Sequence, residues 1–245
     1  MATTLKYLAV ALVFVLLAVS WPSFRLYQEL NKSWSEDPLV WEADIEAFEV
    51  PAQKPHPENA IVFVGSSSIR LWGSLAEDMA PIPVIQRGFG GAKLNDVVHY
   101  AERLVSVYQP TAVVIFAGTN DISSRSIKTP QQLLNSYQQF VTKVRADSPE
   151  LPIYYIAITP SPMRWQVWPN AQAVNAVIES YSQRTPGLFY IDTGPALMDA
   201  EGKPDVDNYA FDTLHLSDKG YSQWTAIIRP RLLKDFPQYE VVTSK

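Results

Sequence analysis

The chain has 245 residues, of which 47% are hydrophobic and 12% aromatic, enough to build the core of one globular domain. Its formal net charge of −5, with no Lys- or Arg-rich run, argues against a protein that binds nucleic acid through its phosphates. The absence of cysteine excludes disulfides, thiolate zinc sites and a cysteine nucleophile.

Residues 1–24 have the composition of an export segment. Residues 7–24 carry no charge, and this length lies between the core of a signal peptide and a membrane-spanning helix. The small residues in Ala18-Val19-Ser20 suit cleavage, whereas Tyr7 and Trp21 bracket the run as interfacial aromatics do. We therefore predict a signal peptide or a membrane anchor, and an exported protein that is periplasmic or extracytoplasmic, either secreted or membrane-anchored. An uncleaved segment would associate with the membrane through residues 7–24.

Residues 25–59 are expected to form a connector with one short helix. Asp37-Pro38 is typical of an N-cap followed by proline in the first helical turn. Large apolar residues then recur at helical spacing and would pack on the main domain: Trp41, Ile45 and Phe48. The prolines within residues 51–57 favour extended backbone after this helix.

From Ala60 onward, short apolar runs alternate with amphipathic stretches. The apolar runs are too short for ordinary helices and lie at residues 60–64, 83–86, 112–117, 152–158 and 188–191. The amphipathic stretches cover 94–108, 130–147, 171–184 and 217–234, the last with Ser217 as N-cap. Continuous apolar strands alternating with helices predict a parallel sheet covered on both faces. We expect one α/β domain over 60–236, a three-layer α/β/α sandwich with a five-stranded sheet, and a C-terminal tail at 237–245.

Polar and glycine-rich motifs follow the predicted strands. Gly65-Ser66-Ser67-Ser68 follows the first strand, Gly88-Phe89-Gly90-Gly91 the second and Gly118-Thr119-Asn120-Asp121 the third. Asp212-Thr213-Leu214-His215 follows the fifth strand after a long loop. Because sites in open parallel sheets form outside the carboxyl ends of the strands, all four motifs are expected at one rim.

A serine turn combined with an aspartate–histidine pair indicates a serine hydrolase. Asp212 can hold the imidazole of His215 in one tautomer and stabilise its charged form. His215 would then act as the base that activates a serine hydroxyl. Ser67 is the predicted nucleophile, and Ser66 is its nearest competitor. Taken alone, such a serine turn is more often a helix N-cap, and the pair downstream changes that interpretation.

The attacked carbonyl would become an oxyanion, which needs donors that are already in place. The backbone N–H of Ser67, the backbone N–H of Gly91 and the side-chain amide of Asn120 are the candidates. Glycine at position 91 lets the backbone approach a ligand closely. Each also has an ordinary explanation, a glycine turn or an Asn-Asp helix cap.

These motifs resemble the SGNH, or GDSL-type, hydrolase superfamily, whose four blocks supply Ser, Gly, Asn and His in that order. The match spans residues 60–220 and assigns the four blocks to Ser67, Gly91, Asn120, and Asp212 with His215. One departure is Ser66, where many members have aspartate. The resemblance implies a flavodoxin-like fold of SGNH type and esterase, lipase-like, thioesterase or carbohydrate-deacetylating activity without a cofactor.

No dinucleotide or phosphate-loop motif and no transition-metal spacing occurs, so we expect neither cofactor nor metal. The acidic stretch 199–207 is interpreted as a solvated loop in preference to a weak calcium site, since it lacks the EF-hand pattern. The loop after the fourth predicted strand contains Arg164, Trp165 and Trp168, which are candidate substrate-binding residues. The tryptophans would form an acyl pocket, stack on a sugar, or pack the loop onto the domain.

We therefore expect an exported ester hydrolase that forms an acyl-enzyme with a short acyl group or acetyl, carried by a small molecule or a glycan. The predicted rim has no long apolar run to serve as a lid, which is the reason for favouring a short acyl group. One alternative is an envelope O-acyltransferase that passes the acyl group to a sugar hydroxyl. Another is a non-catalytic binding module on the same fold.

Overall fold

The computed structural model describes residues 31–49, 56–123 and 127–240. In this part of the chain, five parallel strands form one sheet in the order β2-β1-β3-β4-β5. The strands are β1 Ile61–Gly65, β2 Val84–Gly88, β3 Ala112–Phe116, β4 Ile153–Ile156 and β5 Leu188–Ile191. The predicted α/β class and five-stranded parallel sheet are therefore confirmed.

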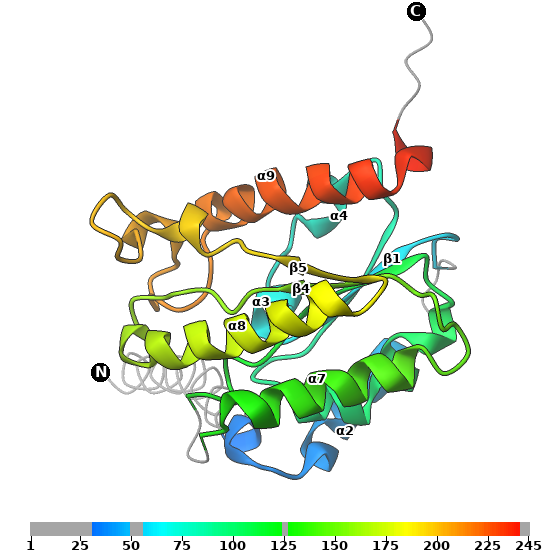
Figure 1. Cartoon of the computed structure of the whole chain (residues 1–245), viewed down its shortest axis with the longest axis horizontal. Helices are drawn as coiled ribbons and strands as arrows, with labels where there is room; N and C mark the ends of the chain where they lie inside the picture. Colours follow the sequence, from blue (N-terminus) through cyan, green and yellow to red (C-terminus); the bar gives the residue numbers. More distant parts are fainter. Residues whose placement is uncertain (1–30, 50–55, 124–126, 241–245) are drawn as a thin grey trace, which may run out of the picture.

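Helices cover both faces of the sheet. The α-helices are α2 Glu42–Glu49, α3 Ser67–Arg70, α4 Leu75–Met79, α5 Leu94–His99, α6 Ala101–Leu104, α7 Pro130–Val144, α8 Trp168–Arg184 and α9 Asp218–Asp235. The short 3-10 helices are η1 Pro38–Trp41, η2 Ser106–Tyr108, η3 Trp165–Val167, η4 Pro195–Leu197, η5 Val206–Asn208 and η6 Pro237–Tyr239. Figure 1 shows α4 and α9 on one side of the sheet and α2, α7 and α8 on the other.

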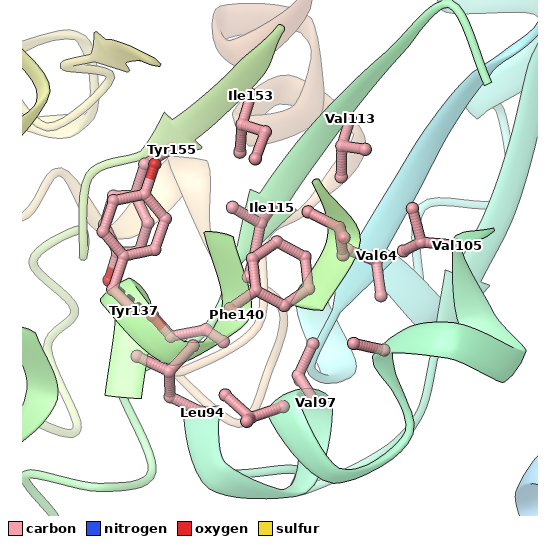
Figure 2. Packing of buried hydrophobic residues seen from close by; sticks show 14 of the residues in the cluster. Val64, Leu94, Val97, Val105, Val113, Ile115, Tyr137, Phe140, Ile153 and Tyr155 are labelled. Atoms are coloured by element: carbon pink, nitrogen blue, oxygen red, sulfur yellow. Dashed lines mark hydrogen bonds between the residues drawn. The ribbon is translucent and has the colours of Figure 1, made fainter. Parts of the chain in front are cut away.

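Two hydrophobic clusters fill the spaces between sheet and helices. Successive side chains of a strand point to opposite faces, so Val62 and Val64 of β1 join the cluster with α5, α6, α7 and α8. Phe63 of β1 instead joins the cluster with α3, α4 and α9. Figure 2 shows the first cluster, with Val64 and Ile115 facing Phe140 of α7. The three-layer sandwich follows from strands that are buried on both faces.

Two elements differ from the sequence prediction. The single helix expected over 94–108 is divided into α5, α6 and η2, because the backbone leaves helical geometry at Tyr100 (φ −96°, ψ 12°) and again at Val105 (φ −130°, ψ −61°). The buried residues nevertheless keep helical spacing. The strand expected over 152–158 ends at Ile156. Beyond it, the side chain of buried Asn175 satisfies both the N–H and the carbonyl of Ile158, at 2.9 and 2.8 Å. The Asn175 side chain therefore makes the hydrogen bonds that a neighbouring strand would otherwise make.

The segment before the sheet packs on the domain as predicted. Asp37 caps η1 by accepting the N–H of Leu39, and Trp41 and Ile45 are almost fully buried. The indole N–H of Trp41 donates to Asp96 at 3.2 Å, and its ring lies edge-on to Phe89. Residues 37–49 are therefore part of the folded unit.

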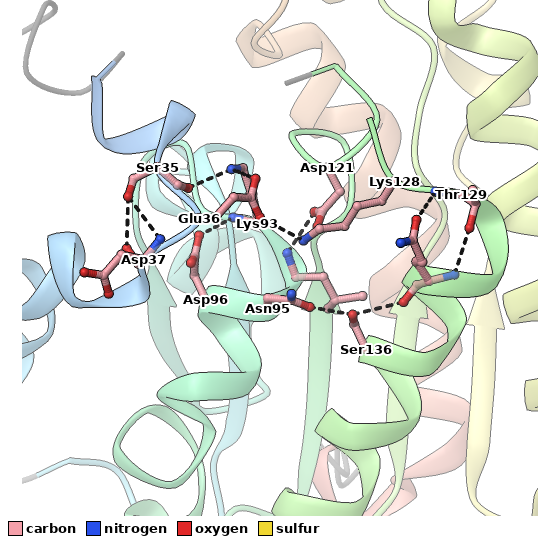
Figure 3. Close-up of polar contacts among 12 residues, drawn as sticks. Ser35, Glu36, Asp37, Lys93, Asn95, Asp96, Asp121, Lys128, Thr129 and Ser136 are labelled. Atoms are coloured by element: carbon pink, nitrogen blue, oxygen red, sulfur yellow. Dashed lines mark hydrogen bonds and ion pairs between the residues drawn. The ribbon is translucent and has the colours of Figure 1, made fainter. Parts of the chain in front are cut away.

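Charged side chains fix the start of this segment to the rim of the sheet. Glu36 pairs with Lys93 at 2.5 Å and with Lys128 at 3.8 Å (Figure 3). Lys128 also pairs with the fully buried Asp121 at 2.9 Å. The Lys93 side chain is only 2% exposed, so its ammonium needs these partners.

The predicted export segment, residues 1–24, lies outside the described residues, as do residues 50–55 and 241–245. No helix in the described part of the chain is both long and apolar enough to cross a membrane. At the other end, η6 brings Tyr239 against the domain, where its hydroxyl contacts Thr111 at 3.1 Å and the carbonyl of Asn59.

Replacing Trp41 with alanine is expected to lower the free energy of unfolding by about 3–5 kcal/mol, because it removes a buried aromatic side chain. Urea unfolding followed by far-UV circular dichroism measures the change. Leu39→Ala is the matched control, since Leu39 is 59% exposed. A loss below about 1 kcal/mol for Trp41→Ala would show that this segment adds little to the core.

Candidate active site

The carboxyl ends of the strands bring the predicted motifs to one rim. Gly65 ends β1 with φ of 145°, and a Cβ there would lie 2.0 Å from the carbonyl oxygen of Phe116. Only glycine lets the chain turn this close to β3. The turn delivers Ser66 and Ser67 directly to the start of α3.

Ser67, His215 and Asp212 form a continuous hydrogen-bonded series. His215 Nε2 lies 2.9 Å from Ser67 Oγ, and His215 Nδ1 lies 2.6 Å from Asp212 Oδ2. An ionised carboxylate only accepts, so Nδ1 must donate to Asp212. Nε2 is then left as the acceptor for the Ser67 hydroxyl.

The aspartate is held by its own turn. Its Oδ1 accepts the backbone N–H groups of Leu214 and His215, both at 3.0 Å, across a left-handed Thr213 (φ 56°). Partial burial raises the pKa of Asp212, but the hydrogen bonds from the His215 ring and from these two backbone groups outweigh it. The pKa of Asp212 therefore lies below its ordinary value, and the carboxylate is ionised at neutral pH.

Ser66 and Ser67 lie differently in the turn. Ser66 is 2% exposed, and its backbone N–H donates to the carbonyl of Phe116 at 3.0 Å. It stands at the N-cap of α3 without a side-chain capping bond. The structure brings Ser67, and not Ser66, to the imidazole of His215.

Asn120 lies 8% exposed beside this series. Its Nδ2 donates to the carbonyl of Ala92 at 2.9 Å, and its Oδ1 accepts from Arg164 at 2.9 Å. The neighbouring Asp121 accepts the N–H of Leu94, the first residue of α5, at 2.8 Å. Asp121 thus caps a helix, whereas Asn120 links three loops of the rim.

Gly91 lies in the same rim but is not among the residues that line the cavity beside Ser67. Its backbone is left-handed (φ 73°), and a Cβ there would lie 2.8 Å from the Cβ of Ser33 and 3.3 Å from the Trp41 ring. The N-terminal segment therefore packs directly against this glycine.

A narrow cavity of about 20 Å³ opens beside Ser67 and His215. It is lined by Ser66, Ser67, Ser68, Phe116, Thr119, Asn120, Thr159, Ser161, Arg164, Leu214 and His215. Arg164 is the residue of the predicted substrate loop that joins this lining. Trp165 and Trp168 instead stack on each other, with ring centroids 6.3 Å apart.

Thr159 and Ser161 also line the cavity, although they are not among the site residues predicted from the sequence. Both follow β4, so the rule that placed the other motifs at the carboxyl rim also points to them. In the predicted solvated loop, Asp205 and Asp207 both pair with Lys219. Within the described ranges, no three His, Asp or Glu side chains are grouped as metal ligands would be.

An α/β sandwich that presents a serine, a histidine and an aspartate in hydrogen-bonded series at its carboxyl rim has the arrangement of a serine ester hydrolase. Residues 57–223 match the model of the GDSL-like Lipase/Acylhydrolase family, and the chain belongs to this family.

Solved structures with the same fold span most of the chain. A GDSL-like lipase from Bacteroides thetaiotaomicron is 19% identical, with 81% of this chain and 98% of that chain covered and a TM-score of 0.66. A carbohydrate esterase family 3 protein from Talaromyces cellulolyticus is 18% identical, with 74% of this chain and 100% of that chain covered and a TM-score of 0.56. A Clostridium thermocellum family 3 carbohydrate esterase is 13% identical, with 74% of this chain and 99% of that chain covered and a TM-score of 0.54. No curated protein sequence matches the chain.

Proposed function

We propose that this protein is an exported ester hydrolase that removes acetyl or other short acyl groups through an acyl-enzyme on Ser67. The observation that carries the proposal is the series Ser67–His215–Asp212, with contacts of 2.9 and 2.6 Å. The proposed substrates are esters on small molecules or glycans.

In the first half-reaction, Ser67 Oγ attacks the ester carbonyl carbon while His215 Nε2 takes the hydroxyl proton. Asp212 stabilises the imidazolium that forms. The tetrahedral intermediate then collapses, and His215 gives its proton to the leaving alcohol oxygen. In the second half-reaction, His215 removes a proton from water, which attacks the acyl-enzyme carbonyl. The bond to Ser67 Oγ then breaks, His215 returns the proton to this oxygen, and the carboxylic acid leaves.

The oxyanion of each tetrahedral intermediate would be stabilised by the predicted donors. The N–H of Ser67 heads α3, where a backbone N–H has no intrahelical acceptor. One N–H of the Asn120 amide is occupied by Ala92, so the second remains for the oxyanion. Gly91 is proposed to supply a third N–H from the neighbouring loop.

The small volume of the cavity supports a short acyl group. Between the lining side chains, the centre of a water-sized group can move through only about 20 Å³. A methyl group would enter this space, whereas a long alkyl chain would extend out of it through its open side. Solved structures with this fold include an acetyl esterase and two family 3 carbohydrate esterases. The stacked rings of Trp165 and Trp168, which follow Arg164 in the chain, are proposed to contact the alcohol part of the ester.

Hydrolysis of a p-nitrophenyl ester series by the purified protein tests the proposal. The kcat/KM for acetate and butyrate is expected to exceed that for octanoate and palmitate by at least about tenfold, because the longer chains exceed the cavity. Higher values for the long chains would overturn the short-acyl assignment. Mass spectrometry of the products with an added oligosaccharide separates hydrolysis from the O-acyltransferase alternative. Hydrolysis releases the free acid, whereas a transferase adds the acyl group to the oligosaccharide.

A further inference from the structure

Arg164 lies in the wall of the cavity that holds Ser67 and His215. It follows β4, and its backbone N–H donates to the carbonyl of Ser161 at 3.2 Å. Its guanidinium donates to the side-chain oxygen of Asn120 at 2.9 Å. The sequence predicted Arg164 as a substrate contact, yet this bond reaches a proposed oxyanion donor instead.

The two neighbours of Asn120 fix the direction of its amide. A guanidinium only donates, so the atom that faces Arg164 must be the oxygen. A carbonyl only accepts, so the atom that faces Ala92 must be the nitrogen. The amide is therefore prevented from flipping, and its second N–H has one direction.

The charge of Arg164 has no carboxylate partner among the described residues. Lys93 and Lys128, the buried or nearly buried lysines of the same rim, both pair with acidic side chains. Burial lowers the pKa of Arg164 to about 10. A desolvated cation without a counter-ion needs polar acceptors, and the side-chain oxygen of Asn120 is the acceptor that Arg164 reaches.

We propose that Arg164 is a positioning residue of the oxyanion hole, which orients and polarises the Asn120 amide through its bond to the side-chain oxygen. This role rests on the proposed ester hydrolysis. Hydrogen bonds in a chain strengthen one another, so a charged donor on the oxygen makes the amide N–H a better donor to the oxyanion. The oxyanion forms only during reaction, so the contribution belongs to kcat rather than to substrate binding.

A double-mutant cycle tests this role with p-nitrophenyl acetate as substrate. Asn120→Ala is expected to lower kcat about 10²- to 10³-fold. Arg164→Met is expected to lower kcat about 10- to 100-fold while KM changes less than about threefold. In the Asn120→Ala background, Arg164→Met is expected to lower kcat by less than about twofold, because its effect passes through the missing amide.

Arg164→Lys keeps a charged donor and is expected to lose less than about tenfold in kcat. This variant also serves if Arg164→Met does not fold, which near-UV circular dichroism and the unfolding midpoint report. The rate at which a fluorophosphonate labels Ser67 provides a second readout, since the phosphonyl oxygen occupies the same hole. It should fall in parallel with kcat across all the variants.

Several outcomes would overturn the proposal. Independent effects of Arg164→Met and Asn120→Ala, whose fold-losses multiply in the double variant, would show that Arg164 does not act through Asn120. A loss confined to KM, or to esters that carry a carboxylate, would make Arg164 a substrate contact instead. A wild-type protein that neither hydrolyses esters nor reacts with the fluorophosphonate would overturn the proposed function itself, and this role with it.

Discussion

Replacing Ser67 with alanine is expected to lower kcat for p-nitrophenyl acetate by about 10⁵- to 10⁶-fold. The variant lacks the only serine oxygen that His215 contacts in the described structure, at 2.9 Å. A residual rate above that of uncatalysed hydrolysis in water is expected, because the oxyanion donors and the cavity remain. Stopped assays at high enzyme concentration measure it, and intact-protein mass spectrometry shows whether a fluorophosphonate still adds to the chain.

Ser66→Ala is the matched control, since it removes the same hydroxyl one residue earlier. Ser66 is buried and is not hydrogen-bonded to His215, so this variant is expected to keep at least about a tenth of wild-type kcat. The assigned nucleophile is wrong if Ser67→Ala keeps more than about 1% of wild-type activity and the fluorophosphonate then labels Ser66 or Ser68.

Asp212→Asn is expected to lower kcat near neutral pH by about 10⁴-fold with the fold intact. The amide oxygen can still accept the backbone N–H groups of Leu214 and His215, so the turn is kept. The amide nitrogen, however, would donate to His215 Nδ1 and place the ring proton on Nε2. A protonated Nε2 cannot accept the proton of Ser67.

Steady-state kinetics and the unfolding midpoint of Asp212→Asn measure the two parts of this expectation. Asp207→Asn is the control, because Asp207 is an exposed partner of Lys219 in the neighbouring loop. It should leave kcat within about threefold. A loss of less than about tenfold in Asp212→Asn would mean that the aspartate neither selects the tautomer nor stabilises the imidazolium.

The sequence was sufficient to predict the sheet and the rim, because both depend on local patterns. Buried parallel strands read as continuous apolar runs, and the chain reverses after each of them through glycine and small polar residues. The motifs around Ser67, Asn120 and His215 meet because of topology alone, and no side-chain geometry was needed to expect this.

The conformations of the loops could not be predicted from sequence patterns. Three adjacent serines have the same chemistry, and only the turn after Gly65 decides that Ser67 reaches the imidazole. The bond from Arg164 to Asn120 joins two loops 44 residues apart, and no periodicity links them. The division of the 94–108 helix was missed because buried residues keep their spacing across a break in the backbone hydrogen bonds.

The contact of Ser33 and Trp41 with Gly91 bears on where the functional unit begins. Residues matched by the family model start at 57, yet the side chains that close one side of the glycine loop come from before that boundary. The pairs from Glu36 to Lys93 and Lys128 cross it as well. A fusion protein that carries this catalytic domain must therefore include residues 31–49, because they are a structural part of the domain and not only a linker before it.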